Sequence, residues 1–122
     1  MSFIDYTKSK LFMQPQQYKV FHYVTSDGKD IFGEWLDRLK DITARAAILK
    51  RIDRAEEGNF GDHRSVGGGV WEIRIHHGPG YRVYYGEDGP KIVLLLCGGD
   101  KKTQRKDIGK AQRLWADYRR LK

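Results

Sequence analysis

Alternating apolar and polar positions near the middle of the chain predict a β-hairpin. Between Val70 and His77, and again between Tyr81 and Gly86, the two kinds of side chain alternate with the period of a half-buried strand. Gly78-Pro79-Gly80 separates the two segments and is typical of a tight turn. A third segment, Lys91 to Cys97, contains an unbroken apolar run and therefore predicts a central strand that is buried on both faces.

Segments with helical periodicity lie before and after this group of strands in the sequence. Apolar residues recur every three or four positions over 29–40 and 42–57, and the two helices are nearly contiguous, so we expect them to form an antiparallel hairpin. The same spacing from Ile108 to Leu121 predicts a C-terminal helix, which Asp100 or Thr103 could cap. Near the start of the chain, the aromatic and β-branched segment 18–24 predicts a first strand.

Two glycine-rich segments and one polar segment bound these elements. The segment 58–69 is predicted to be too flexible for regular structure, and Gly98-Gly99-Asp100 is predicted to end the third strand. Residues 1–17 show no clear period and are predicted to be an N-terminal extension to one domain at 18–122. The predicted order is β-α-α-β-β-β-α: an α+β domain whose antiparallel sheet carries a helix hairpin on one face, followed by a C-terminal helix.

The charge balance suggests which classes of partner this domain binds. The chain has 23 Lys and Arg against 16 Asp and Glu, a formal net charge of +7. Such a charge attracts polyanions, and nucleic acid is the most common of these for a cytoplasmic protein, although an acidic protein partner or an anionic membrane is also attracted. We expect a cytoplasmic protein without a membrane partner, because no apolar stretch approaches about 20 residues and the first residues lack the pattern of a signal peptide.

Several conspicuous residue types are predicted to be structural. The single cysteine, Cys97, lies in the apolar run and should act as a small buried hydrophobe. Trp35, Trp71 and Trp115 lie on the apolar sides of their elements, so they are predicted to be core anchors rather than base-stacking platforms. His76 and His77 are adjacent on a strand and point to opposite sides, so we predict neither a metal site nor another cofactor.

Strand alternation gathers the polar side chains of the hairpin on one face, opposite Ile73 and Val83. They are Glu72, Arg74, His76, Arg82 and Tyr84. Two guanidiniums can bind phosphate oxygens, and an imidazole, a phenol or a carboxylate can move protons, so this face is a candidate phosphodiester site. The alternative is a solvated sheet face whose charges pair across strands, which the residues alone favour by a small margin.

A basic run follows the third strand of this group. Its cations are Lys101, Lys102, Arg105 and Lys106. Such a run is usually a solvated helix start, but this one brings four positive charges to the end of a central strand. These four residues are therefore the candidate RNA-binding set.

The hairpin sequence from Val70 to Tyr85, VWEIRIHHGPGYRVYY, and the segment from Ile92 to Lys101, IVLLLCGGDK, resemble the addiction-module killer proteins, a HigB-like branch of the RelE/ParE toxin superfamily. The resemblance covers roughly residues 18–118. It implies a RelE-like fold and a cognate antitoxin, commonly a helix-turn-helix protein. For the RelE and HigB branches it further implies metal-independent cleavage of mRNA on the ribosome, which inhibits translation.

The resemblance also implies roles for particular residues. Arg82 matches the arginine that follows Gly-Tyr in the hairpin, Arg74 matches a basic residue on the preceding strand, and Lys101 or Lys102 matches a basic position after the last strand. The sequence departs from RelE in two respects: Glu72 replaces a lysine, and a C-terminal catalytic tyrosine has no counterpart. Proton transfer would then fall to Tyr84, His76 or Glu72, or the chemistry differs from that of RelE.

Three functions stay open at this point. The first is a ribosome-dependent mRNA endoribonuclease toxin, which the arginine face favours. The second is a ParE-like toxin that poisons DNA gyrase with the same fold. The third is a catalytically silent module that binds only its antitoxin or nucleic acid. The fold does not decide among them, because one superfamily can host several targets.

Overall fold

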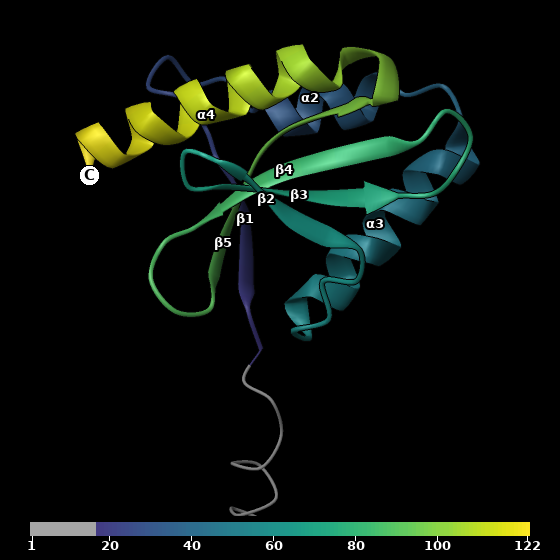
Figure 1. Cartoon of the computed structure of the whole chain (residues 1–122), viewed down its shortest axis with the longest axis horizontal. Coiled ribbons are helices and arrows are strands. Elements are labelled where there is room, and N and C mark those ends of the chain that lie inside the picture. The colour runs from purple at the N-terminus through teal and green to yellow at the C-terminus, as the bar shows by residue number, and fades with distance from the viewer. Residues whose placement is uncertain (1–16) are drawn as a thin grey trace, which may run out of the picture.

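A five-stranded sheet of order β1-β5-β4-β3-β2 forms the centre of the computed structural model, which describes residues 17–122 (Figure 1). The strands are β1 (Lys19–His22), β2 (His63–Gly67), β3 (Val70–Ile75), β4 (Tyr81–Glu87) and β5 (Ile92–Asp100). The pair β1 and β5 is parallel, and every other neighbouring pair is antiparallel. The predicted N-terminal extension lies almost wholly outside the described residues.

Helices cover both faces of this sheet. They are α2 (Ile31–Arg38), α3 (Ile42–Glu56), a short 3-10 turn η1 (Lys101–Thr103) and α4 (Gln104–Leu121). Figure 1 shows α4 crossing one side of the sheet, while α2 and α3 lie on the other. The α+β class is thus confirmed, and the arrangement is consistent with a RelE-like fold. No helix in the described part of the chain has the length and apolar character needed to span a membrane.

The alternation of β3 and β4 divides the molecule into two cores. On one face, Ile73 and Val83 pack with Phe32 and Ile48 from α2 and α3, as the sequence predicts. A second core on the opposite face joins the sheet to Trp115 and its neighbours on α4. β5 contributes to both cores, as predicted for a central strand, because successive side chains of a strand point to opposite faces.

Cys97 belongs to the second core. Its side chain is buried, and burial raises the pKa of the thiol to about 12. A thiol reacts as its thiolate, so Cys97 acts as a small apolar residue, as predicted.

β2 corrects the prediction that residues 58–69 lack regular structure. His63–Gly67 pairs antiparallel with β3, so that Arg64 lies opposite Glu72. Gly67, Gly68 and Gly69 have φ values of 92°, 62° and 81°, which residues other than glycine rarely adopt. The glycines therefore form the turn of a hairpin rather than a flexible loop.

The second correction concerns the end of β5, which runs through Gly98 and Gly99 to Asp100 instead of stopping before them. A Cβ atom on Gly98 would lie 2.3 Å from the ring of Trp35, and one on Gly99 would lie 1.8 Å from the carboxylate of Asp107. The glycines thus permit close packing against a strand. Asp100 then accepts hydrogen bonds from the backbone N–H groups of Lys102 and Thr103 and caps η1.

Candidate functional site

The register of the β3–β4 hairpin places the two predicted arginines side by side. Arg74 and Arg82 are direct partners across the strands, and Glu72 is the partner of Tyr84. All four side chains lie on the face away from Ile73 and Val83, as strand alternation predicts.

A pocket of about 450 Å³ opens at the turn end of this hairpin. It is lined by Arg74, Ile75, His76, His77, Gly78, Pro79, Gly80, Tyr81, Arg82 and Lys101. We call it the hairpin pocket. It therefore brings together two guanidiniums, two imidazoles and an ammonium group, the last from Lys101, beyond the end of β5.

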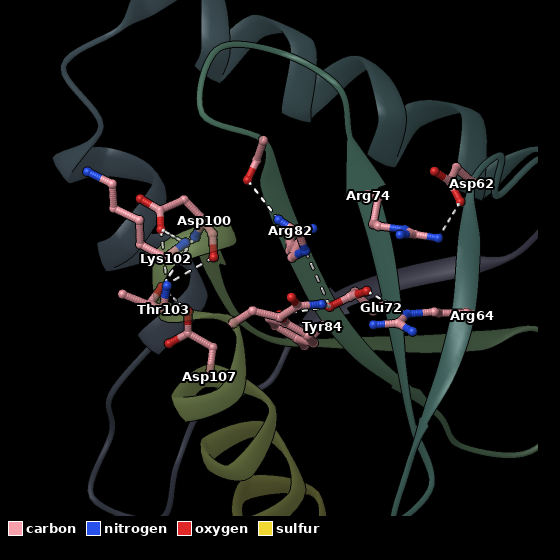
Figure 2. Close-up of polar contacts among 12 residues, drawn as sticks. Asp62, Arg64, Glu72, Arg74, Arg82, Tyr84, Asp100, Lys102, Thr103 and Asp107 are labelled. Atoms are coloured by element: carbon pink, nitrogen blue, oxygen red, sulfur yellow. Dashed lines mark hydrogen bonds and ion pairs between the residues drawn. The ribbon is translucent and has the colours of Figure 1, made fainter.

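Glu72 lies beneath the pocket as a fully buried carboxylate, with 0% of its surface exposed. It accepts hydrogen bonds from Arg64 Nε (3.0 Å) and the Tyr84 hydroxyl (2.9 Å), and its Oε2 also accepts one from the Gln104 side chain (3.0 Å). Figure 2 shows this carboxylate between Arg64 and Arg82, at the start of α4. The predicted solvated sheet face is therefore wrong for this part of the hairpin, because α4 covers it.

The hydrogen bonds to Glu72 keep it ionised. Burial raises the pKa of the carboxyl, but hydrogen bonds from Gln104, Arg64 and Tyr84 outweigh burial, so the pKa lies below its ordinary value of 4.5. The pKa of the Tyr84 phenol lies well above its ordinary 10.0, because the group is buried and its hydroxyl donates a hydrogen bond to Glu72. Tyr84 thus holds its proton firmly, and both side chains are enclosed by protein.

Arg82 is held from two sides. Its Nη1 donates to the backbone carbonyl of Gly80 at 3.1 Å, and its Nε lies 3.6 Å from Glu72 Oε2. Only 10% of the side chain is exposed. The Nε–Oε2 distance is too long for a hydrogen bond, and the buried Nε atom has no acceptor among the described residues. Arg82 is therefore oriented by its contacts with Gly80 and Glu72.

Asp62 organises the other side of the pocket. Its carboxylate lies 3.5 Å from Arg74 Nη2 and accepts a hydrogen bond from His76 Nε2 at 2.7 Å. The hydrogen bond from His76 is the main reason that the pKa of Asp62 lies below its ordinary 3.8. The side chain of His76 is 75% exposed, so an oriented imidazole faces the solvent at the rim of the pocket.

The predicted basic run divides at this site. Lys101 lines the hairpin pocket, whereas Lys102 and Lys106 are exposed outside it. Arg105 lines a smaller depression of about 230 Å³ together with Arg64. One member of the run thus enters the pocket, and the other three lie outside it.

Sequence reasoning missed Asp62, Arg64 and Gln104. The first two lie beside or in β2, and the signal that could have found them was the glycine turn followed by Val70, which is typical of a hairpin. Pairing across that hairpin would have placed Arg64 opposite Glu72. Gln104 reaches Glu72 from a helix 32 residues away, and no local sequence pattern predicts that contact.

The chemistry of the pocket suits an anion. Arginine presents paired donors to phosphate oxygens, and a histidine–carboxylate pair can move a proton. Among residues 17–122, no cluster of three or more His, Cys, Asp or Glu side chains could hold a metal ion.

Comparison with known proteins identifies a family and a relative that this chain resembles. The family described as "Phage derived protein Gp49-like (DUF891)" matches residues 34–116, a range that contains the whole hairpin pocket. An uncharacterized protein from Haemophilus influenzae (strain ATCC 51907 / DSM 11121 / KW20 / Rd) is 52% identical over 83 residues, which are 68% of this chain and 84% of the relative.

Proposed function

Because the chain belongs to the Gp49-like family, a RelE/HigB-like addiction-module killer family, we propose that it is the toxin of a toxin–antitoxin pair and cleaves mRNA on the ribosome without a metal ion. Membership of this family is consistent with a toxin. The observation that carries the ribonuclease activity is the hairpin pocket, in which Arg74 and Arg82 lie beside His76 and Lys101.

In the proposed reaction, the 2′-hydroxyl of the RNA attacks the adjacent phosphorus. An O2′–P bond forms and the P–O5′ bond breaks, which leaves a cyclic phosphate, and the departing 5′ oxygen takes a proton from water to become a hydroxyl. Arg82 and Arg74 bind the non-bridging oxygens, on which negative charge develops. Lys101 adds a third cation beside the phosphate.

His76 is our proposed base for the 2′-hydroxyl proton. Of the three candidates named from the sequence, it alone is exposed at the pocket, and Asp62 orients its ring. Glu72 and Tyr84 are enclosed under α4, so we assign them a positioning role: they fix Arg82 from beneath.

The experiment that tests this function is a brief induction of the protein, followed by mapping of new RNA 5′ ends across the cell. We expect cuts inside translated regions, in register with the reading frame, and fewer or none in non-translated RNA. Intact mRNA with DNA breaks would overturn the proposal and indicate a gyrase poison instead.

The assignment of His76 has a matched control in the chain. His22 also contacts a carboxylate, with its Nδ1 2.8 Å from Asp30 Oδ2, but it lies outside the hairpin pocket. Removing a general base typically lowers a rate by about 10²–10⁴-fold. We expect His76→Gln to lose cleavage to this extent and His22→Gln to cleave at the wild-type rate. Equal rates in the two variants would remove His76 from the mechanism.

We propose three partners. The ribosome and mRNA are the targets, and a helix-turn-helix antitoxin encoded with the toxin is the inhibitor. An antitoxin that neutralises this protein should cover part of the basic surface around Arg74 and Arg82. The affinity of the pair should then fall as salt rises, because salt screens attraction between exposed charges. A salt-independent complex that leaves both arginines open would contradict this partner.

A further inference from the structure

A second cleft lies next to the hairpin pocket, at the end of β5. β1 pairs with β5 only as far as Leu95, so no strand in the described part of the chain flanks Gly98 and Gly99 on that side. The cleft has a volume of about 280 Å³ and lies between α2 and the beginning of α4. Its lining includes Trp35, Arg38, Tyr81, Asp107 and Lys110. We call it the Trp35 cleft.

The two glycines of β5 shape this cleft. Because they carry no side chains, Trp35 approaches the backbone at Gly98 from one side and Asp107 approaches it at Gly99 from the other. The indole of Trp35 is half-buried and packs edge-on near Tyr81, with ring centroids 6.3 Å apart. The cleft therefore combines an aromatic wall, a bare backbone and a carboxylate.

The Trp35 cleft and the hairpin pocket are adjacent. Tyr81 lines both. Arg82 and Gly99 are direct partners across β4 and β5, and neighbouring strands lie about 4.8 Å apart. A ligand whose phosphate lies against Arg82 can therefore place its next group in the cleft.

The polar groups of the cleft match an RNA base next to a phosphate. Single-stranded RNA is recognised by stacking bases on aromatic side chains and by hydrogen bonds to their edges. The carboxylate of Asp107, which accepts a hydrogen bond from Thr103 at 2.5 Å, is an acceptor for the N–H groups of a base. Arg38 and Lys110 add positive charge for the backbone.

We propose that the Trp35 cleft is a nucleobase subsite, which binds the base next to the phosphate held in the hairpin pocket. The base stacks on Trp35 and presents its N–H edge to Asp107. This assignment rests on the proposed function for the identity of the ligand as RNA. It gives Trp35, which also packs against the first core as predicted, a second role as a determinant of where the message is cut.

Binding can be tested without cleavage. The probes are inorganic phosphate, nucleoside 5′-monophosphates and a dinucleotide whose 2′-deoxy sugar prevents the reaction, each titrated into the ¹⁵N-labelled protein. We expect the nucleotides to shift the indole N–H signal of Trp35 and phosphate alone to leave it unmoved. If nucleotides bind without moving this signal, the subsite is wrong; this readout needs no variant.

A pair of variants measures the contribution of stacking. Base–aromatic stacking corresponds to a loss of about 5- to 100-fold in affinity when the ring is removed. We expect Trp35→Leu to lose nucleotide affinity to this extent and to bind phosphate as the wild type does. Trp71→Leu is the matched control, since Trp71 is also half-buried in the first core but lies beside His63, away from the cleft. Equal nucleotide affinity in the two variants would overturn the proposal.

Mapped cuts separate this inference from the proposed function. If mRNA is cut, Trp35→Phe should change the base preferred next to the cut while cutting continues; an unchanged preference counts against the subsite alone. If mRNA is not cut but nucleotides shift the Trp35 signal, the ribonuclease activity fails and the subsite stands.

Discussion

In the middle of the β3–β4 hairpin both faces are buried, yet they contain opposite kinds of side chain. On one face, Ile73 and Val83 pack against α2 and α3 in an apolar core. On the other, Glu72 and Tyr84 are fully buried and Arg82 is 8% exposed, and they contact one another through polar atoms. Side chains of neighbouring residues in the same strands thus lie in two different environments, one apolar and one polar.

The apolar face of the hairpin stabilises the fold, whereas the polar face has features that stability alone does not explain. An apolar face stabilises a sheet simply by leaving water, whereas a buried carboxylate costs free energy that its partners must offset. Well-packed apolar residues in place of a buried ion pair are often neutral or stabilising. Stability alone therefore does not require Glu72, whereas the positioning role that we propose for it does.

The largest effect should follow from removing the guanidinium that this arrangement holds. We expect Arg82→Ala to lower cleavage by roughly 100- to 1000-fold, because one preorganised donor at a developing charge has that effect. The cleavage rate of Arg82→Lys should lie between those of the wild type and Arg82→Ala, since lysine keeps the charge but lacks the paired donors. Cleavage rates in a reconstituted translation system would measure both.

The control for this prediction is Arg54→Ala, which removes an exposed arginine of α3. It should keep the wild-type rate, and all three variants should keep the wild-type circular dichroism spectrum. A well-folded Arg82→Ala that still cuts mRNA normally would show that the polar face is only structural.

Glu72→Gln should lower both the cleavage rate and the stability of the fold, and its effect on cleavage should be smaller than that of Arg82→Ala. The amide keeps the shape of the side chain but leaves Arg82 without its buried counter-ion. We expect a loss of about 1–3 kcal/mol in the free energy of unfolding and an accompanying loss of cleavage. Denaturant unfolding and the cleavage assay would measure the two. A variant as active as the wild type would show that Glu72 does not position Arg82.

The same variant has a pH signature. The pKa of Glu72 is lowered in the folded protein, so its stabilisation is present above the unfolded value, near 4.5, and is lost as pH falls through the folded pKa. The difference in unfolding free energy between wild type and Glu72→Gln should therefore be full at neutral pH and shrink below about pH 4.5. A difference that stays constant to pH 3 would mean that folding does not lower the pKa of Glu72.

The apolar face should respond in the opposite way. Ile73→Val removes one methylene group from the first core, which typically costs about 0.5–1.5 kcal/mol. The rate per folded molecule should not change, because the side chain points away from the pocket. A change in that rate with an unaltered fold would mean that the two faces are coupled more closely than their contacts indicate.

The smallest effect is expected at the exposed rim. Lys102→Ala combined with Lys106→Ala should reduce RNA affinity only a few-fold, because both side chains are exposed outside the pocket. The salt dependence should also become shallower, by about 0.7 in the log–log slope for each lost phosphate contact. Fluorescence anisotropy over a range of salt concentrations would measure it. An unchanged slope would exclude these lysines from the RNA surface.

Local patterns in the sequence predicted local structure well. The alternation around Ile73 and Val83 placed both faces of the hairpin correctly, because side-chain direction in a strand depends only on its period. The same pattern could not show that α4 encloses Glu72 and Tyr84, since that contact joins residues far apart in the chain. β2 was missed because Gly67–Gly69 was interpreted as flexible, although positive φ values make glycine equally suited to a tight turn.

The parallel pairing of β1 with β5 has a consequence for the order in which the protein can assemble. Lys19 pairs with Ile92, and Glu72 receives its third hydrogen bond from Gln104, so neither contact can form on a ribosome until synthesis has passed those later residues. Contacts between distant residues also form slowly, because a long loop must close first. A nascent chain can therefore complete the hydrogen bonds that support Glu72 only after Gln104 has been synthesised.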